Sequence, residues 1–154
     1  MRNRLGLIYS KLYSHFGPQH WWPAQSPFEV MVGAILTQNT SWANVEKAIS
    51  KLKANKFLAP KIIHRLSFKQ LSGAIKSAGY YNIKAVRLKE FVKFFLDRYT
   101  GSIKRMSKQG LVPLRRQLLA VKGIGPETAD SILLYALNKP VFVIDAYTLS
   151  LIHI

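Results

Sequence analysis

The chain has 154 residues, the length of one domain, and its 49% apolar residues are enough to fill a core. Its 23 Lys and Arg against 7 Asp and Glu give a formal charge of +16, so the expected partner is a polyanion, with nucleic acid favoured over an acidic membrane surface. The absence of cysteine excludes disulfides, iron–sulfur clusters and thiolate zinc sites, and the four histidines show no metal-ligand spacing.

Apolar residues recur with a helical period along almost the whole chain, which predicts an all-α fold. A first helix ends at Gly17 and Pro18. Three prolines and two adjacent tryptophans in residues 18–27 predict an irregular loop. Residues 28–36 are apolar on every side, which is typical of a helix in the middle of a bundle.

The next segments carry helix caps. Ser41 is expected to cap a helix that runs to about residue 54, and Ser67 is expected to cap the following one. A long helix opens at Asn82, and its basic residues are interpreted mostly as a solvated face. These residues are Lys84, Arg87, Lys89, Lys93 and Arg98. The basic, polar residues 102–112 are interpreted as a linker.

A glycine-rich hairpin follows at residues 121–126. One short helix ends near Ala120, another begins at Pro126, and the two glycines of Gly123-Ile124-Gly125 lie between them. Glycines let the backbone turn tightly and approach another molecule, so the amide N–H groups of the turn can point at an anion. Ile124 is expected to anchor the turn in the core. The pattern predicts a hairpin that holds a DNA phosphate without reading a base.

Gly-x-Gly alone is a weak signal, and a simple helix–helix turn would explain it. The helices on both sides, the Thr-Ala pair that begins at Thr128 and the charge of +16 favour phosphate binding instead. Lys122 lies on the phosphate side of the turn and is expected to contact the DNA backbone.

Three blocks together resemble the helix-hairpin-helix DNA glycosylases of the endonuclease III superfamily, also called HhH-GPD proteins. The first covers residues 28–40, the second covers residues 78–85, and the third joins the hairpin to Pro-Val-Phe-Val-Ile-Asp at 140–145. The resemblance extends from about Trp21 to Tyr147, which is nearly the whole chain.

The resemblance implies a six-helix bundle, residues 21–140, joined to a second helical lobe, with DNA bound across the cleft. The N-terminal helix, residues 1–20, would belong to that second lobe. Residues 141–154 would hold the catalytic loop and a short last helix. The second lobe would be incomplete, so we expect a C-terminally truncated or frameshifted chain, or an apolar surface that a partner covers.

The resemblance also implies an activity, in which the enzyme flips a damaged base out of the stack and cuts its N-glycosidic bond. Asp145 falls on the catalytic aspartate, whose carboxylate stabilises an oxocarbenium-like transition state. An ordinary helix N-cap is the alternative role for Asp145. Gln38 falls on the residue that fills the gap left in the duplex.

Glu127 stands where family members that also nick the strand carry a Schiff-base lysine, so hydrolysis without strand cleavage is expected. Glu127 and Asp145 would form an anionic pocket for a cationic base such as 3-methyladenine, with Trp21 and Trp22 stacked on it. This combination is similar to the endonuclease-III-like 3-methyladenine glycosylases. Packing between lobes would explain the two tryptophans equally well. Glu127 would equally be explained as an acidic residue that stabilises the first turn of its helix.

Three hypotheses therefore stand. The first is a monofunctional alkylbase glycosylase that acts as a monomer on double-stranded DNA with a damaged base. The second is a truncated, catalytically inactive DNA-binding remnant, and the third is a basic helical module that binds RNA. We expect a cytoplasmic, nucleoid-associated bacterial protein without membrane contact. We expect no metal or cofactor, with a monovalent cation at the hairpin carbonyls left open.

Overall fold

The computed structural model describes residues 2–19 and 22–152, and these ranges contain helices and no strand, as predicted. No helix in them combines the length and the apolar content needed to cross a membrane. The α-helices are α1 (Arg2–Phe16), α2 (Pro27–Leu36), α3 (Trp42–Ala54), α4 (Pro60–Arg65), α5 (Phe68–Ala74), α6 (Tyr81–Tyr99), α7 (Ile103–Ser107), α8 (Leu111–Leu119), α9 (Pro126–Ser131) and α10 (Ala146–Ile152). Two further turns are the 3₁₀ turn η1 (Lys76–Ala78) and the π-helical turn η2 (Ile132–Ala136).

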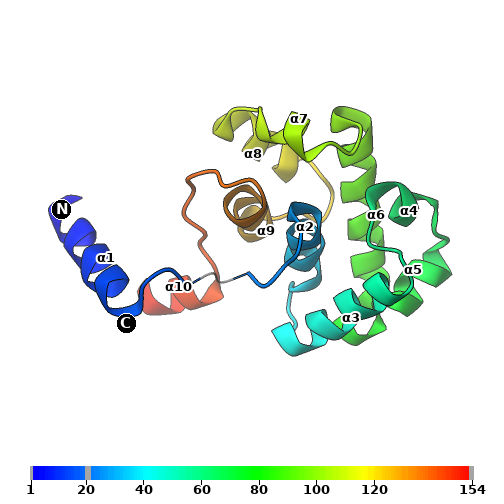
Figure 1. The fold of residues 1–154 in the computed structure, drawn as a ribbon, viewed down its shortest axis with the longest axis horizontal. Coiled ribbons are helices and arrows are strands. Elements are labelled where there is room, and N and C mark those ends of the chain that lie inside the picture. The colour runs from blue at the N-terminus through cyan, green and yellow to red at the C-terminus, as the bar shows by residue number, and fades with distance from the viewer. Residues whose placement is uncertain (1, 20–21, 153–154) are drawn as a thin grey trace.

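Helix α2 lies at the centre of the bundle and packs against α3, α6, α9 and η2 (Figure 1). Every residue from Phe28 to Leu36 is buried, which confirms the prediction from its all-round apolar pattern. The helix begins where the Ser26 hydroxyl accepts a hydrogen bond from the Glu29 N–H. The Glu29 carboxylate, itself buried, pairs with Lys53 of α3 at 2.7 Å.

The predicted caps differ in their outcome. Ser67 forms a full capping box with Gln70 at the start of α5. Ser41 stands at the N-cap position of α3, but its side chain makes no capping hydrogen bond. The long helix α6 is found as predicted, although it begins one residue before Asn82, after a left-handed Tyr80.

The linker predicted for residues 102–112 is wrong, because it contains the short helix α7. Ser102 caps this helix by accepting a hydrogen bond from the Arg105 N–H, and Met106 is fully buried beneath it. The Lys139 ammonium donates to the carbonyls of Ser107 and Gln109, which ties down the helix end. Its only two apolar residues, Ile103 and Met106, are too few to show a helical period in a basic segment, so sequence analysis did not detect this helix.

The solvated face predicted for α6 is found at Lys93 and Arg98, which are exposed, but not at Lys84. The Lys84 side chain is 1% exposed, and its ammonium donates to the carbonyls of Leu36 at 2.8 Å and Ala78 at 2.6 Å. Burial, with a smaller contribution from the Arg87 charge, lowers the pKa of Lys84 to about 8. This lysine therefore joins α2, η1 and α6 inside the bundle.

Helices α1 and α10 lie at the opposite end of the molecule from α6, at the left of Figure 1. The apolar side chains of Ile8, Leu12 and Phe16 in α1 are each more than half exposed, at 55%, 53% and 61%. The first helix therefore leaves its apolar face uncovered, as expected. The division of the chain into two lobes stays a prediction.

The depressed pKa of Lys84 predicts a specific pH dependence of stability. Between pH 8 and 10.5 the unfolded chain binds more protons at this lysine than the folded one. The unfolding free energy of the wild type should therefore rise with pH relative to Lys84→Met, by about 3 kcal/mol across that window. Urea unfolding of both proteins at several pH values measures this difference. Lys93→Met controls for the loss of a charge, and a pH-independent difference between wild type and Lys84→Met would contradict the prediction.

Candidate functional site

The predicted hairpin is present between α8 and α9. The Ile124 N–H donates to the Val121 carbonyl at 3.0 Å, and the Ile124 side chain is buried, as expected for an anchor. Gly125 occupies the N-cap position of α9, which Pro126 begins. The two helices are joined by a bidentate ion pair between Arg115 and the buried Asp130, with N–O distances of 2.7 and 2.9 Å.

The two hairpin glycines serve different purposes. Gly123 has a left-handed φ of 90°, and a Cβ atom built on it would lie 2.3 Å from Cγ of Arg87. Both the backbone conformation and the neighbouring side chain therefore require glycine at this position. A Cβ atom on Gly125 would meet nothing within 4 Å, so the space beside it is open to another molecule.

Gln38 brings the loop after α2 into contact with the hairpin. Its amide Nε2 donates to the Gly123 carbonyl at 3.1 Å and to Oγ1 of the buried Thr128 at 2.9 Å. Its Oε1 accepts a hydrogen bond from the Arg87 guanidinium of α6. Three residues singled out in the sequence thus meet at one point. The Gly123 carbonyl accepts its hydrogen bond from Gln38. A monovalent cation at the hairpin carbonyls stays a prediction.

A cleft of about 770 Å³ lies in front of this network. One side is lined by the loop that holds Gln38, and another by Arg87 and the hairpin from Gly123 onward. Glu127 of α9 and the first residues of α10, Ala146 and Tyr147, also line it. The cleft therefore joins the hairpin, the glutamine loop and the segment that directly follows Asp145.

Asp145 stands immediately before α10 and caps it. Its Oδ1 accepts hydrogen bonds from the backbone N–H and from the hydroxyl of Thr148, both at 2.7 Å. These bonds, the backbone one first, lower the pKa of Asp145 below its ordinary value. Asp145 therefore caps α10, which is the alternative role considered for it in the sequence analysis. The same hydrogen bonds favour the ionised form of its half-buried carboxylate.

Glu127 and Tyr135 share the electrostatic field of Asp145. Partial burial and then the Asp145 charge raise the pKa of Glu127, although its side chain is largely exposed. The same two causes raise the pKa of Tyr135. These three residues form an acidic corner, the name used below for Glu127, Tyr135 and Asp145. Of the three, Glu127 lines the cleft, and Asp145 directly precedes the lining residue Ala146.

Trp22 packs into an aromatic cluster. Its ring centroid lies 5.5 Å from that of Trp42 in an edge-to-face contact and 5.3 Å from that of Tyr135. A Cβ atom on Gly33 would lie 3.1 Å from the Trp22 ring, so the ring packs closely on the backbone of α2 at this glycine. Trp22 thus packs against other aromatic rings, the alternative to base stacking considered in the sequence analysis. Its contact with Tyr135 joins this cluster to the acidic corner. Trp21 lies outside the described residues.

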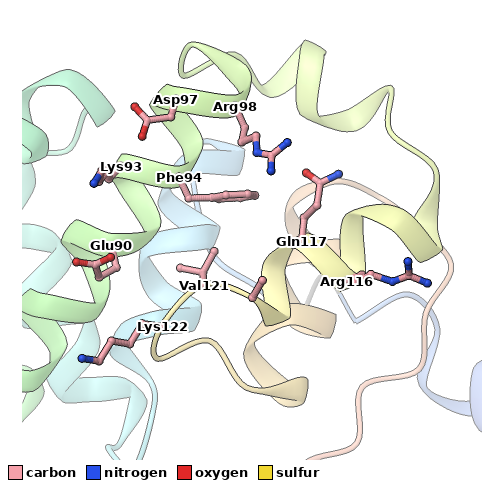
Figure 2. Close-up of a pocket in the computed structure, with 10 residues that line it drawn as sticks. Glu90, Lys93, Phe94, Asp97, Arg98, Arg116, Gln117, Val121 and Lys122 are labelled. Carbon is pink, nitrogen blue, oxygen red and sulfur yellow. The ribbon is translucent and has the colours of Figure 1, made fainter.

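Lys122 does not line the cleft, although the next residue, Gly123, does. Lys122 is exposed and lines a second pocket of about 520 Å³ between α6 and α8. Figure 2 shows Phe94 on the floor of this pocket, with Arg98 and Gln117 at one end and Lys122 at the other. The contact of Lys122 with a DNA backbone stays a prediction.

Sequence analysis missed two residues near the cleft. Arg87 was assigned to a solvated face, yet it lies one turn after the buried Lys84 on α6 and contacts the hairpin. Tyr80 is 70% exposed and has a left-handed φ of 44°, a strained conformation for this residue type. It directly follows Gly79, which faces the cleft residue Thr40. The one sequence signal for a feature at this position is the Gly79-Tyr80 pair itself.

Among known protein families, the model of the HhH-GPD superfamily of base excision DNA repair proteins matches residues 32–153. A candidate DNA repair glycosylase of Methanocaldococcus jannaschii is 50% identical over 143 residues, which cover 92% of this chain and 64% of that protein. Endonuclease III of Thermotoga maritima is 28% identical over 121 residues, covering 79% of this chain and 53% of that protein. The chain thus spans between about half and two thirds of the length of these relatives.

Solved structures with the same fold include the H. pylori 3-methyladenine DNA glycosylase bound to 1,N6-ethenoadenine. It is 34% identical with a TM-score of 0.79, and the match covers 94% of this chain and 68% of that one. A non-covalent endonuclease III–DNA complex matches with a TM-score of 0.78 at 20% identity, covering 98% and 67% of the two chains. The latter likeness shows the fold.

The geometry of the hairpin predicts effects of different size for alanine substitutions at its two glycines. Gly123→Ala should lower the unfolding free energy by about 1–3 kcal/mol, because it strains the backbone and displaces Arg87. Gly125→Ala should change stability by less than about 1 kcal/mol, since its Cβ atom would enter open space. Thermal unfolding of the two variants measures the contrast, and equal destabilisation would contradict it.

Proposed function

Because the chain belongs to the HhH-GPD superfamily of base excision DNA repair proteins, we propose that it is a DNA glycosylase that hydrolyses the N-glycosidic bond of a flipped, damaged base. The observation that carries this proposal is one cleft with two kinds of lining. The glycine hairpin, which is suited to a phosphate, lines it together with the Glu127 carboxylate, and Asp145 directly precedes Ala146, which also lines it.

Duplex DNA is the proposed partner, and the chain would act on it as a monomer. The charge of +16 supplies long-range attraction to phosphates, and the open space at Gly125 lets a phosphate approach the hairpin backbone. A DNA complex of endonuclease III with this fold supports the assignment. The network around Gln38 places the glutamine loop on the same cleft.

The proposed chemistry depends on Asp145 being ionised. Its two hydrogen bonds from Thr148 stabilise the carboxylate, which can then stabilise positive charge on the sugar as the base leaves. Water supplies the oxygen that bonds to the sugar and gives up a proton to the solvent, while the cationic base departs with the bonding electrons as a neutral molecule. Glu127 cannot form an imine, so the reaction ends at hydrolysis, without strand cleavage.

An alkylated purine is the proposed substrate class. Such a base is cationic, so the carboxylates of Glu127 and Asp145 would attract it. Stacking of Trp22 on the base stays a prediction, since its ring packs on Trp42 and Tyr135 and lines a pocket other than the cleft. The 34% identity to a 3-methyladenine DNA glycosylase supports this class.

A second candidate function is DNA binding without catalysis. The observation that favours it is the exposed apolar face of α1, since a lobe that leaves Ile8, Leu12 and Phe16 uncovered supports α10 and Asp145 poorly. This candidate predicts salt-sensitive duplex binding and no base release from any substrate.

Asp145→Asn separates the catalytic role from the capping role. Asparagine is as good an N-cap as aspartate, so the stability of the variant should stay within about 1 kcal/mol of the wild type. The release of free methylated purines from alkylated duplex DNA should fall at least about 100-fold, because the charge is lost. Chromatography of the released bases and thermal unfolding measure the two effects. Release that survives in the variant would remove Asp145 from the chemistry, and no release by the wild type would favour the DNA-binding candidate.

Borohydride trapping tests the absence of lyase chemistry. A glycosylase that works through a lysine amine becomes covalently linked to DNA when borohydride reduces its imine. With Glu127 in the lysine position, we expect no cross-linked band on a denaturing gel under conditions of base release. A family member that carries the lysine is the positive control. A trapped band with this chain would show that another amine attacks the sugar.

A further inference from the structure

The pocket between α6 and α8 is not used by the proposed reaction. It has a volume of about 520 Å³ and shares no lining residue with the cleft. On the hairpin, the lining of the pocket ends at Lys122, and the lining of the cleft begins at Gly123. A ligand in the pocket would therefore leave the lining of the cleft free for DNA.

The floor of this pocket is apolar and is supported from the core. The half-buried Phe94 and the buried Val121 form it. The buried Tyr99 packs edge-to-face on Phe94, with ring centroids 5.7 Å apart, and donates a hydrogen bond to Oε1 of Gln117. Because this oxygen is engaged and no described residue accepts from Nε2, the Gln117 amide has N–H groups left for a ligand.

Charged side chains surround this floor without pairing with one another. Within residues 2–19 and 22–152, the ion pairs join Lys53 to Glu29 and Arg115 to Asp130, so the rim of the pocket takes part in none. The exposed rim groups are Lys93, Arg98, Arg116, Lys122, Glu90 and Asp97. Figure 2 shows both arginines on the side of Gln117, away from the two carboxylates, so this side of the pocket is locally positive.

We propose that the pocket between α6 and α8 binds an acidic peptide segment of another protein, with one apolar side chain of that segment on Phe94. The carboxylates of the segment would pair with Arg98 and Arg116, because a guanidinium group can hold a carboxylate through two parallel hydrogen bonds. A backbone carbonyl of the segment would accept from Gln117. The charge of +16 would attract such a segment from a distance.

Two features favour a peptide over nucleic acid in this pocket. Glu90 and Asp97 on the α6 side would repel a sugar–phosphate backbone, which carries a charge at every nucleotide, whereas a peptide can place neutral residues there. The apolar floor also suits a single aliphatic or aromatic side chain of a partner. A duplex would present phosphates to this floor, because its bases are stacked inside.

Selection from a phage library of short random peptides tests the proposal with the wild-type chain. The selection is carried out at about 0.15 M salt, which screens long-range attraction, and with an excess of undamaged duplex to cover the DNA-binding surface. The selected peptides should carry several carboxylates and one large apolar residue. Replacing that residue with alanine should weaken binding at least about fivefold in fluorescence anisotropy, because its contact with the floor is lost.

The double variant Arg98→Glu/Arg116→Glu tests whether these peptides bind in the pocket. Both side chains are exposed, so the fold should be retained, and thermal unfolding checks this. Affinity for the selected peptides should fall at least about 10-fold, because two attractive contacts become repulsive. Lys47→Glu/Lys69→Glu is the matched control, since it makes the same change in net charge on α3 and α5, outside the pocket and the cleft. It should weaken binding by about twofold or less.

Two results would overturn the proposal. The first is a selection that yields no acidic peptides with an apolar residue. If duplex binding then falls further in the pocket variant than in the control variant, the pocket is part of the nucleic-acid surface. The second is a set of selected peptides that bind Arg98→Glu/Arg116→Glu as tightly as the wild type. Base release by the wild type tests the proposed function separately and is independent of either result.

Discussion

The bundle depends on the hydrogen-bond donors that reach the carbonyl groups at the C-terminal end of its buried central helix. Helix α2 is buried on all sides, so the carbonyls of its last turn cannot reach water and must find donors within the protein. The Lys84 ammonium provides one for Leu36 and a second for Ala78, although burial lowers its pKa to about 8. Even the neutral amine has two N–H groups, one for each carbonyl. This contact therefore joins the helix end to η1 and α6 in either protonation state.

The functional loop begins at the residue after this contact. Thr37 continues the anchoring, because its hydroxyl donates to the Gly33 carbonyl at 2.9 Å. Gln38 follows and reaches the hairpin, where it meets Arg87. Lys84 and Arg87 are one helical turn apart, so a single face of α6 supports both the end of α2 and the hairpin. Packing in the core and the shape of the cleft are thus determined by the same helix.

Features set by local sequence were predicted well. The all-apolar pattern of α2, the Ser67 capping box and the limits of the hairpin each depend on residues within a few positions of one another. The burial of Lys84 and the contact of Arg87 with Gly123 could not be predicted from one sequence, because the partners are 48 and 36 residues away along the chain. A lysine on a charged helix is usually solvated, and only the tertiary structure shows which one is not.

The candidate site also contains some features that the sequence predicts and others that only the tertiary structure shows. Its glycines, Gln38 and Asp145 were found because their residue types and spacing match a known family. The place of Trp22 against Trp42 and Tyr135 was not predictable, since three distant segments form that cluster. Asp145 shows why two roles had to be left open for one residue. The bonds that cap α10 are the same bonds that keep its carboxylate ionised.

In the proposed function, the distribution of charge separates attraction to DNA from the choice of base. The charge of +16 would act on the phosphates over a distance of about 8–10 Å at ordinary ionic strength, without distinguishing one base from another. The acidic corner acts only at close range and opposes the phosphates, so it affects only a base that has left the stack. Its two carboxyl groups differ in turn, because hydrogen bonds lower the pKa of Asp145, whereas burial and the neighbouring charge raise that of Glu127. Groups whose pKa values are moved apart by their surroundings are suited to different tasks. An Asp145 whose hydrogen bonds favour the ionised form would suit stabilisation of the sugar cation, and a carboxyl such as Glu127, which is ionised more readily when a cation lies beside it, would suit recognition of a charged base.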